Sequence, residues 1–157
     1  WFAKDVSSYN AFIKALLSDD TEAMNEYMNQ IAGATFSYFD TGKRASGKAE
    51  PERFYHGFVL GLMVDLADRY AITSNRESGF GRYDIMLEPK KENLDAILIE
   101  FKVFHPRRDN SLEDTVQAAL AQIEEKKYAE TLIAKGISEE RIRKYGFAFK
   151  GKEVLVG

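Results

Sequence analysis

Two short apolar runs joined by a polar bend, residues 83–87 and 96–103, most constrain how this chain can fold. The bend between them contains proline, lysine and asparagine, which are typical of loops. The pattern therefore predicts two antiparallel strands joined by a loop that is longer than a minimal hairpin turn. If the hairpin folds about Glu92, Asp84 lies opposite Glu100.

The second run carries charges on a face that is otherwise apolar. Glu100 and Lys102 share one face of the strand because side chains alternate along it. Ala96 and Leu98 lie on that same face, which indicates a central strand rather than the solvated face of a half-exposed one. Buried charges are costly unless they are paired, hydrogen-bonded or bound to metal. Facing carboxylates at Asp84 and Glu100 would repel each other, and a divalent cation would relieve the repulsion.

Asp84, followed by Glu100-Phe101-Lys102 after an apolar run, resembles the motif of the PD-(D/E)XK nuclease-like superfamily. Tyr83 stands where the superfamily often has proline. The resemblance implies an α/β fold with a restriction-endonuclease-like αβββαβ core, a mixed sheet flanked by helices. Helical and strand periodicity in the chain independently give the same order of elements, followed by an additional terminal strand.

A longer run, SNRESGFGRYD at residues 74–84, resembles the branch of this superfamily found at the C-terminus of AAA-like ATPase proteins. This resemblance covers about residues 51–157. It implies that an AAA-like ATPase domain belongs to the same full-length chain. The chain begins at Trp1 rather than Met, so we expect the full-length protein to be longer.

The resemblance implies a metal-dependent nuclease that hydrolyses phosphodiester bonds in DNA or RNA, with DNA favoured, and with Mg²⁺ or Mn²⁺ as cofactor. The expected ligands are Asp84, Glu100, the backbone carbonyl of Phe101 and, as an auxiliary, Glu52. Lys102 would assist catalysis. Gln122 on the long helix would orient the site, with Gln117 as its alternative.

Four further residues are expected to contact substrate: His56, Arg76, Arg82 and Lys126. Arginine can clamp phosphate with two parallel hydrogen bonds, although either arginine could instead neutralise a nearby carboxylate. His56 lies four residues after Glu52, so the two could also be an ordinary helical surface pair. Lys126, with the Lys127-Tyr128 that follows it, would form a nucleic-acid wall or a solvated face.

The chain divides into an N-terminal helical segment with a linker, residues 1–48, and a nuclease-like domain, residues 49–157. Amphipathic helices are predicted within residues 8–17 and around Met24 to Ile31, the second capped by Ser18 or Asp19. The Gly- and Lys-rich stretch 41–50 reads as a linker or mobile loop. A helix from Pro51 to about Tyr70 and a long helix from Ser111 to Gly136 are expected to flank the sheet.

Composition narrows the function classes. The 157 residues include no cysteine, which excludes a disulfide framework and a thiolate metal site. The net charge is −3, so nucleic-acid binding must use a local basic patch. No apolar run is long enough to cross a membrane and no signal peptide is seen, so we expect a cytoplasmic protein. The alternative function is a catalytically silent nucleic-acid-binding or regulatory module of an AAA-like ATPase protein.

Overall fold

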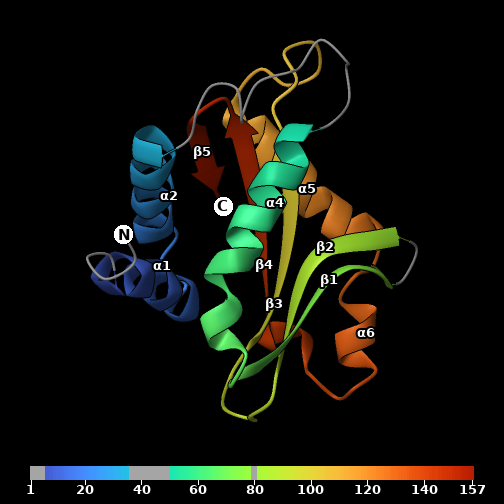
Figure 1. Ribbon diagram of the computed structural model, residues 1–157. Helices are drawn as coiled ribbons and strands as arrows, with labels where there is room; N and C mark the ends of the chain where they lie inside the picture. Colours follow the sequence, from blue (N-terminus) through green and yellow to red (C-terminus); the bar gives the residue numbers. More distant parts are fainter. Residues whose placement is uncertain (1–5, 36–49, 79–80) are drawn as a thin grey trace.

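The computed structural model describes residues 6–35, 50–78 and 81–157, with side chains described in 11–34, 54–74 and 84–157 (Figure 1). Helices and strands alternate in the order that the periodicity predicts. In chain order they are α1 (Val6–Ser18), α2 (Thr21–Thr35), α4 (Glu50–Leu62), η2 (Val64–Leu66), β1 (Tyr70–Ser78), β2 (Gly81–Pro89), β3 (Ala96–Val103), α5 (Leu112–Glu125), α6 (Glu130–Ile133), η3 (Glu139–Arg141), β4 (Ile142–Lys150) and β5 (Glu153–Val156).

One five-stranded sheet in the order β1-β2-β3-β4-β5 forms the centre of the fold. Only β3 and β4 pair in parallel; the other neighbours are antiparallel. A parallel pair needs a long crossover connection, and α5 lies within that connection. The mixed sheet flanked by helices confirms the predicted restriction-endonuclease-like α/β fold.

The register between β2 and β3 is the one predicted for a hairpin centred on Glu92. The pairs are Ile85↔Ile99, Met86↔Leu98 and Leu87↔Ile97. Asp84 and Glu100 each lie one residue beyond the last pair, Ile85↔Ile99. The two predicted metal-binding carboxylates therefore come from neighbouring strands, at the point where the pairing ends.

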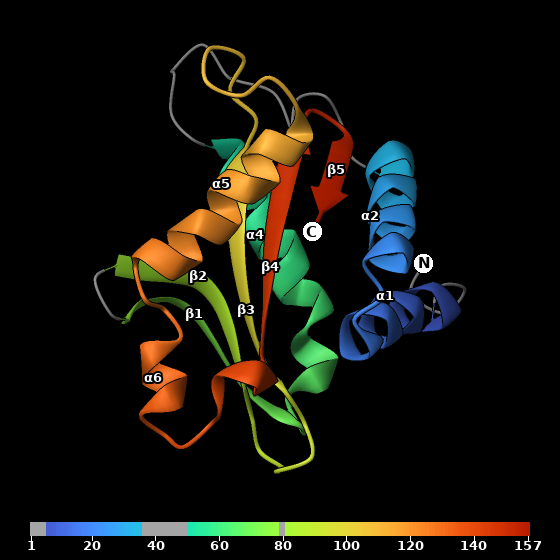
Figure 2. The same ribbon diagram turned by 180° about the vertical axis from the view of Figure 1, so that it is seen from behind.

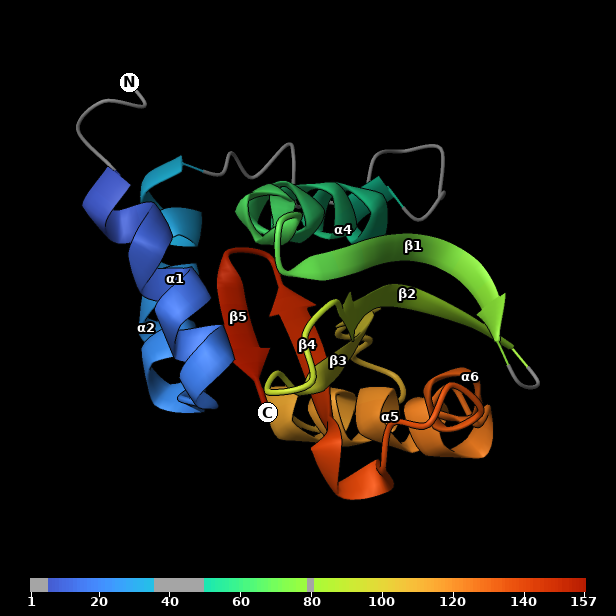
Figure 3. The same cartoon turned by 90° about the horizontal axis from the view of Figure 1, so that it is seen from below.

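Helices cover both faces of the sheet, as the view from below shows (Figure 3). α4 covers one face, where Ile97, Ile99 and Phe101 of β3 join the larger apolar core. α5 and α6 cover the other face, seen in front in Figure 2, where Ala96 and Leu98 pack in a second cluster. β3 is thus central and apolar on both sides, so the charges at its end lie beside a core.

Two local features place α5 against the sheet. Ser111 caps its N-terminus by accepting a 3.3 Å hydrogen bond from the N–H of Asp114, as predicted. Gly146 of β4 lies beneath the helix, where a Cβ atom would come within 2.8 Å of the Val116 carbonyl oxygen. Glycine at this position therefore allows a close approach between helix and strand, which helps set the height of α5 above the sheet.

α2 packs beside the edge strand β5, and α1 packs against α2 (Figure 1). Asn25 and Asn29, one turn apart on α2, each bond the main chain of this strand twice. Each donates from Nδ2 to a carbonyl oxygen and accepts from an N–H through Oδ1, at 2.7–2.9 Å, with Val156 and Val154 as the respective partners. The two amides serve as a neighbouring strand would, and they satisfy an edge that would otherwise be open.

Several predicted boundaries are wrong. Asp20, not Ser18 or Asp19, caps α2, because its carboxylate accepts from the N–H of Ala23 at 3.0 Å. The predicted helix 51–70 ends its α-helical part at Leu62 and continues as η2. The long helix ends at Glu125, because Lys127 adopts a left-handed conformation (φ 53°) and breaks it before α6.

A further boundary differs from the prediction, and one predicted segment lies mostly outside the described residues. β1 extends to Ser78 rather than ending near Asn75, which shortens the expected turn. Of the predicted linker 41–50, residues 41–49 lie outside the described residues, and Glu50 begins α4. Within the described ranges, every helix is too short or too polar to cross a membrane.

Candidate active site

The candidate site lies where β2 leaves β3. β2 pairs with β3 from Leu87 back to Ile85; beyond that point the β1–β2 hairpin curves away from β3 (Figures 1 and 3). At this fork the carboxylate Oδ2 of Asp84 accepts a 2.8 Å hydrogen bond from the main-chain N–H of Phe101. The Asp84 side chain thus accepts from a main-chain N–H group of β3 at the point where the ladder between β2 and β3 ends.

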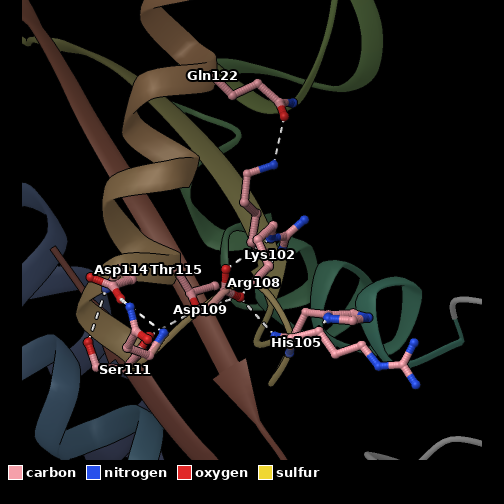
Figure 4. Close-up of polar contacts among 10 residues, drawn as sticks. Lys102, His105, Arg108, Asp109, Ser111, Asp114, Thr115 and Gln122 are labelled. Carbon is pink, nitrogen blue, oxygen red and sulfur yellow. Dashed lines mark hydrogen bonds and ion pairs between the residues drawn. The ribbon is translucent and has the colours of Figure 1, made fainter.

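Glu100 and Lys102 are joined through one side-chain amide of α5. Gln122 donates from Nε2 to Oε1 of Glu100. Its Oε1 accepts a 2.7 Å hydrogen bond from Lys102 Nζ (Figure 4). A carboxylate only accepts and an ammonium only donates, so these two partners fix the orientation of the amide. The structure therefore brings together Glu100, Lys102 and Gln122, three residues that the sequence predicts as catalytic.

The Glu100 carboxylate is buried, so it needs hydrogen-bond or charged partners to remain ionised. Glu100 is only 3% exposed, whereas Lys102 is half-buried. A carboxylate at that depth is costly without compensating charge or hydrogen bonds. The Gln122 amide supplies one hydrogen bond to this carboxylate and another to the nearby Lys102 ammonium. The two charged groups are thereby held next to an apolar core.

Tyr128 is a contact that the sequence reasoning missed. Gln122 Nε2 lies 3.1 Å from its hydroxyl, and the side chain is buried. The prediction that Tyr128 belongs to an exposed nucleic-acid wall is therefore wrong. Lys127, just before the buried ring, adopts a left-handed conformation, and the sequence of the lysine pair gives no sign of it.

Asp109 connects the end of β3 to the start of α5 (Figure 4). Its buried carboxylate accepts from the His105 N–H (2.8 Å), from the Thr115 hydroxyl (3.1 Å) and from Arg108 Nε (2.9 Å). The hydrogen bond from Arg108, helped by those from His105 and Thr115, lowers the pKa of Asp109 to about 2. Because Lys102 precedes this junction and Gln122 follows it, Asp109 helps to hold their elements in place.

The other predicted residues are placed as follows. Lys126 is exposed at the C-terminal end of α5, where its N–H bonds the Gln122 carbonyl at 3.0 Å, and Gln117 is exposed earlier on that helix. His56 Nε2 lies 2.8 Å from Ser74 Oγ and 3.2 Å from the Asp84 carbonyl oxygen. The side chains of Glu52, Arg76 and Arg82 lie outside the described residues, although their backbones belong to α4, β1 and β2.

The donor set suits a hard divalent cation. Asp84 and Glu100 offer carboxylate oxygens from neighbouring strands, just beyond the last pair of β2 and β3, and the Phe101 carbonyl lies next to Glu100 in the chain. Oxygen ligands of this kind suit Mg²⁺ or Mn²⁺ rather than a thiolate-preferring ion. Among the described side chains there is no group of three or more His, Cys, Asp and Glu residues that could hold a metal. Among the described side chains, the proposed metal ligands therefore include two carboxylates, those of Asp84 and Glu100.

A pocket of about 300 Å³ lies at the other end of β3, by the β2–β3 loop. Its lining includes Lys90, Lys135 and Arg141, each of which is bonded to a protein oxygen. The pocket is remote from Lys102 along the strand. It therefore contributes nothing to the candidate site.

Comparison with known proteins identifies the family of the chain. A family model described as the PD-(D/E)XK nuclease superfamily matches residues 50–157, more than half of the chain. No curated protein matches the sequence. Nucleases of this superfamily generally use divalent metals and act on nucleic acid. The family match, together with the mixed sheet, leads to one conclusion: the chain belongs to the PD-(D/E)XK nuclease superfamily.

Proposed function

We propose that this protein is a metal-dependent nuclease that hydrolyses phosphodiester bonds. The observation that carries the proposal is the shared amide of Gln122, which holds the Glu100 carboxylate and the Lys102 ammonium together beside the Asp84 fork. A structural ion pair would not need a second carboxylate, that of Asp84, on the neighbouring strand beside it. A hydrolytic site needs both an anionic pocket for a cation and a positive charge for the phosphate.

Asp84, Glu100 and the Phe101 carbonyl would hold Mg²⁺ or Mn²⁺, with Glu52 as auxiliary ligand. The chemistry that such a cation supplies, when bound, is activation of water and neutralisation of phosphate charge. The chain contributes the geometry: the Asp84–Phe101 hydrogen bond sets one carboxylate, and Gln122 sets the other.

Lys102 would stabilise the charge that develops on the phosphate oxygens during attack by water. Lysine suits this role because it is a compact positive charge with three donors. Gln122 accepts one of those donors, so the remaining two can face substrate. The products are one phosphomonoester end and one hydroxyl end, because water adds across the broken P–O bond.

We favour DNA over RNA as the substrate, with Arg76, Arg82 and Lys126 as backbone contacts. Arg76 and Arg82 lie on the β1–β2 hairpin, and Lys126 ends the helix that carries Gln122. These elements flank the fork. Phosphate contacts there would position a strand across the site without reading its sequence.

The run SNRESGFGRYD supports a further part of the proposal, that the domain works with an AAA-like ATPase domain of the same full-length chain. ATP hydrolysis would then accompany nucleic-acid cleavage. A full-length chain in which ATP leaves the cleavage rate unchanged would contradict this part of the proposal alone.

The direct test incubates the protein with Mn²⁺ or Mg²⁺ and with single- and double-stranded DNA and RNA. We expect cleavage that falls about 100-fold or more in Asp84→Asn and in Lys102→Ala. Lys91→Ala, an exposed lysine of the β2–β3 loop, is the matched control and should cleave normally. Cleavage unchanged in both site variants, or none by the wild type under any condition, would contradict a nuclease; the second result favours the silent module.

A further inference from the structure

His56 of α4 contacts all three strands that meet at the fork. Its Nε2 lies 2.8 Å from Ser74 Oγ on β1 and 3.2 Å from the Asp84 carbonyl oxygen on β2. Its ring meets the ring of Phe101 on β3 edge to face, with centroids 5.6 Å apart and an interplanar angle of 83°. One side chain thus contacts both partners of the Asp84–Phe101 hydrogen bond.

The role of this nitrogen depends on the tautomer of the ring. A carbonyl oxygen only accepts, so a hydrogen bond to Asp84 needs the tautomer that carries a hydrogen on Nε2. In that tautomer the Ser74 hydroxyl oxygen accepts from the same N–H group. The contact is directed, and a residue of equal size without a donor at that position could not make it.

The position of Phe101 shows from which side His56 acts. Phe101 belongs to the core on the α4 face of the sheet, while Glu100 and Lys102 alternate to the opposite face, where Gln122 meets them. His56 therefore supports the fork from behind, with its Nε2 directed at two protein atoms.

We propose that His56 is a positioning residue for the metal site. It holds the main chain of Asp84 through the carbonyl group and the side of Phe101 through ring packing. The Asp84 carboxylate is thereby aimed at the gap facing Glu100. The inference rests on the proposed function, because a carboxylate needs aiming only if it binds a cation. Groups that orient metal ligands from outside the coordination shell typically affect metal affinity about 10- to 100-fold.

The test is a calorimetric Mn²⁺ titration of the full chain, with thermal unfolding measured in parallel. His56→Phe keeps the ring against Phe101 and removes the donor, so Mn²⁺ affinity should fall about 10-fold or more. His56→Gln restores an N–H donor and should recover affinity to within about three-fold of the wild type. Ser74→Ala, which removes only the second acceptor, should weaken binding less. It also carries the test if His56→Phe does not fold.

His105→Gln is the matched control, because His105 is the only other histidine of the chain, is exposed and lies outside the fork. It should bind Mn²⁺ as the wild type does. If His56→Phe and Ser74→Ala also bind normally while Asp84→Asn does not, His56 merely packs and the inference is overturned. If Asp84→Asn itself binds Mn²⁺ normally, the proposed function fails and the inference fails with it.

Discussion

The carboxylate of Asp84 accepts the main-chain N–H of Phe101 at 2.8 Å, across the point where two paired strands part. A buried N–H without a partner costs about 1–3 kcal/mol. By taking this donor with a side chain, the fold lets β2 curve away without that cost. The same hydrogen bond fixes the direction of the Asp84 carboxylate, a proposed metal ligand, so the separation of the strands and the proposed metal site depend on one contact.

That dependence predicts different outcomes for two substitutions at Asp84. Asp84→Asn keeps an acceptor for Phe101, so its free energy of unfolding should stay within about 0.5 kcal/mol of the wild type while Mn²⁺ binding is lost. Asp84→Ala should also lose binding, and it should be destabilised by about 1–3 kcal/mol. Urea denaturation and calorimetry measure the two quantities. Equal stability of both variants would mean that the hydrogen bond does not support the fork.

Gln122 should matter for catalysis beyond its contribution to packing. Gln122→Ala removes the amide that joins Glu100 to Lys102, so we expect kcat to fall about 10- to 100-fold. Gln117→Ala, on the same helix but exposed, is the control and should retain the wild-type kcat. A normal kcat in Gln122→Ala would show that the bridge is not needed for turnover.

Asp109 should make stability depend on pH in the acid range. Its folded-state pKa is lowered to about 2, chiefly by Arg108. The charged form therefore stabilises the fold above about pH 4, and this contribution disappears as the pH falls through about 2. Asp109→Asn should cost about 2 kcal/mol at pH 7 and progressively less below pH 4.

Asp68→Asn, an exposed aspartate between η2 and β1, provides the comparison for the Asp109 measurement. Its effect on the free energy of unfolding should stay within about 0.5 kcal/mol at pH 7. A cost for Asp109→Asn that is the same at pH 7 and pH 2 would contradict the role of the ionised carboxylate.

The two asparagines of α2 should protect the edge of the sheet. Asn25→Ala or Asn29→Ala should each cost about 1–3 kcal/mol, because each leaves an N–H and a carbonyl group of β5 without its amide partner. The double variant should also self-associate in size-exclusion chromatography, since an uncovered strand edge can pair with another chain. Asn93→Ala in the exposed β2–β3 loop should do neither. A fully stable, unassociated double variant would refute this role.

The sequence predicted the parts of the site that depend on local patterns. Alternation along β3 placed Glu100 and Lys102 on one face, and the centre of the hairpin at Glu92 gave the register that the structure has. Both follow from the two-residue period of a strand, which needs no knowledge of distant contacts. The cap at Ser111 was predictable for the same reason.

The parts that escaped prediction depend on residues far apart in the chain. The Asn25 amide bonds Val156, 131 residues away, and the sequence pattern of α2 shows only its apolar stripe. The break at Lys127 follows no glycine or proline, so the helix appeared continuous, and the inward turn of Tyr128 stayed hidden. The contacts of His56 with Ser74 and Asp84 were not predicted either, because they depend on how α4 packs on the sheet.

The most direct test of the account is a crystal of the full chain soaked in Mn²⁺ and examined by anomalous scattering. A metal site of the proposed kind predicts a strong anomalous peak between the carboxylates of Asp84 and Glu100, within bonding distance of the Phe101 carbonyl oxygen. The same soak of Asp84→Asn crystals should show no peak there. A wild-type map without density at the fork under saturating Mn²⁺, or with the ion bound elsewhere, would contradict the account.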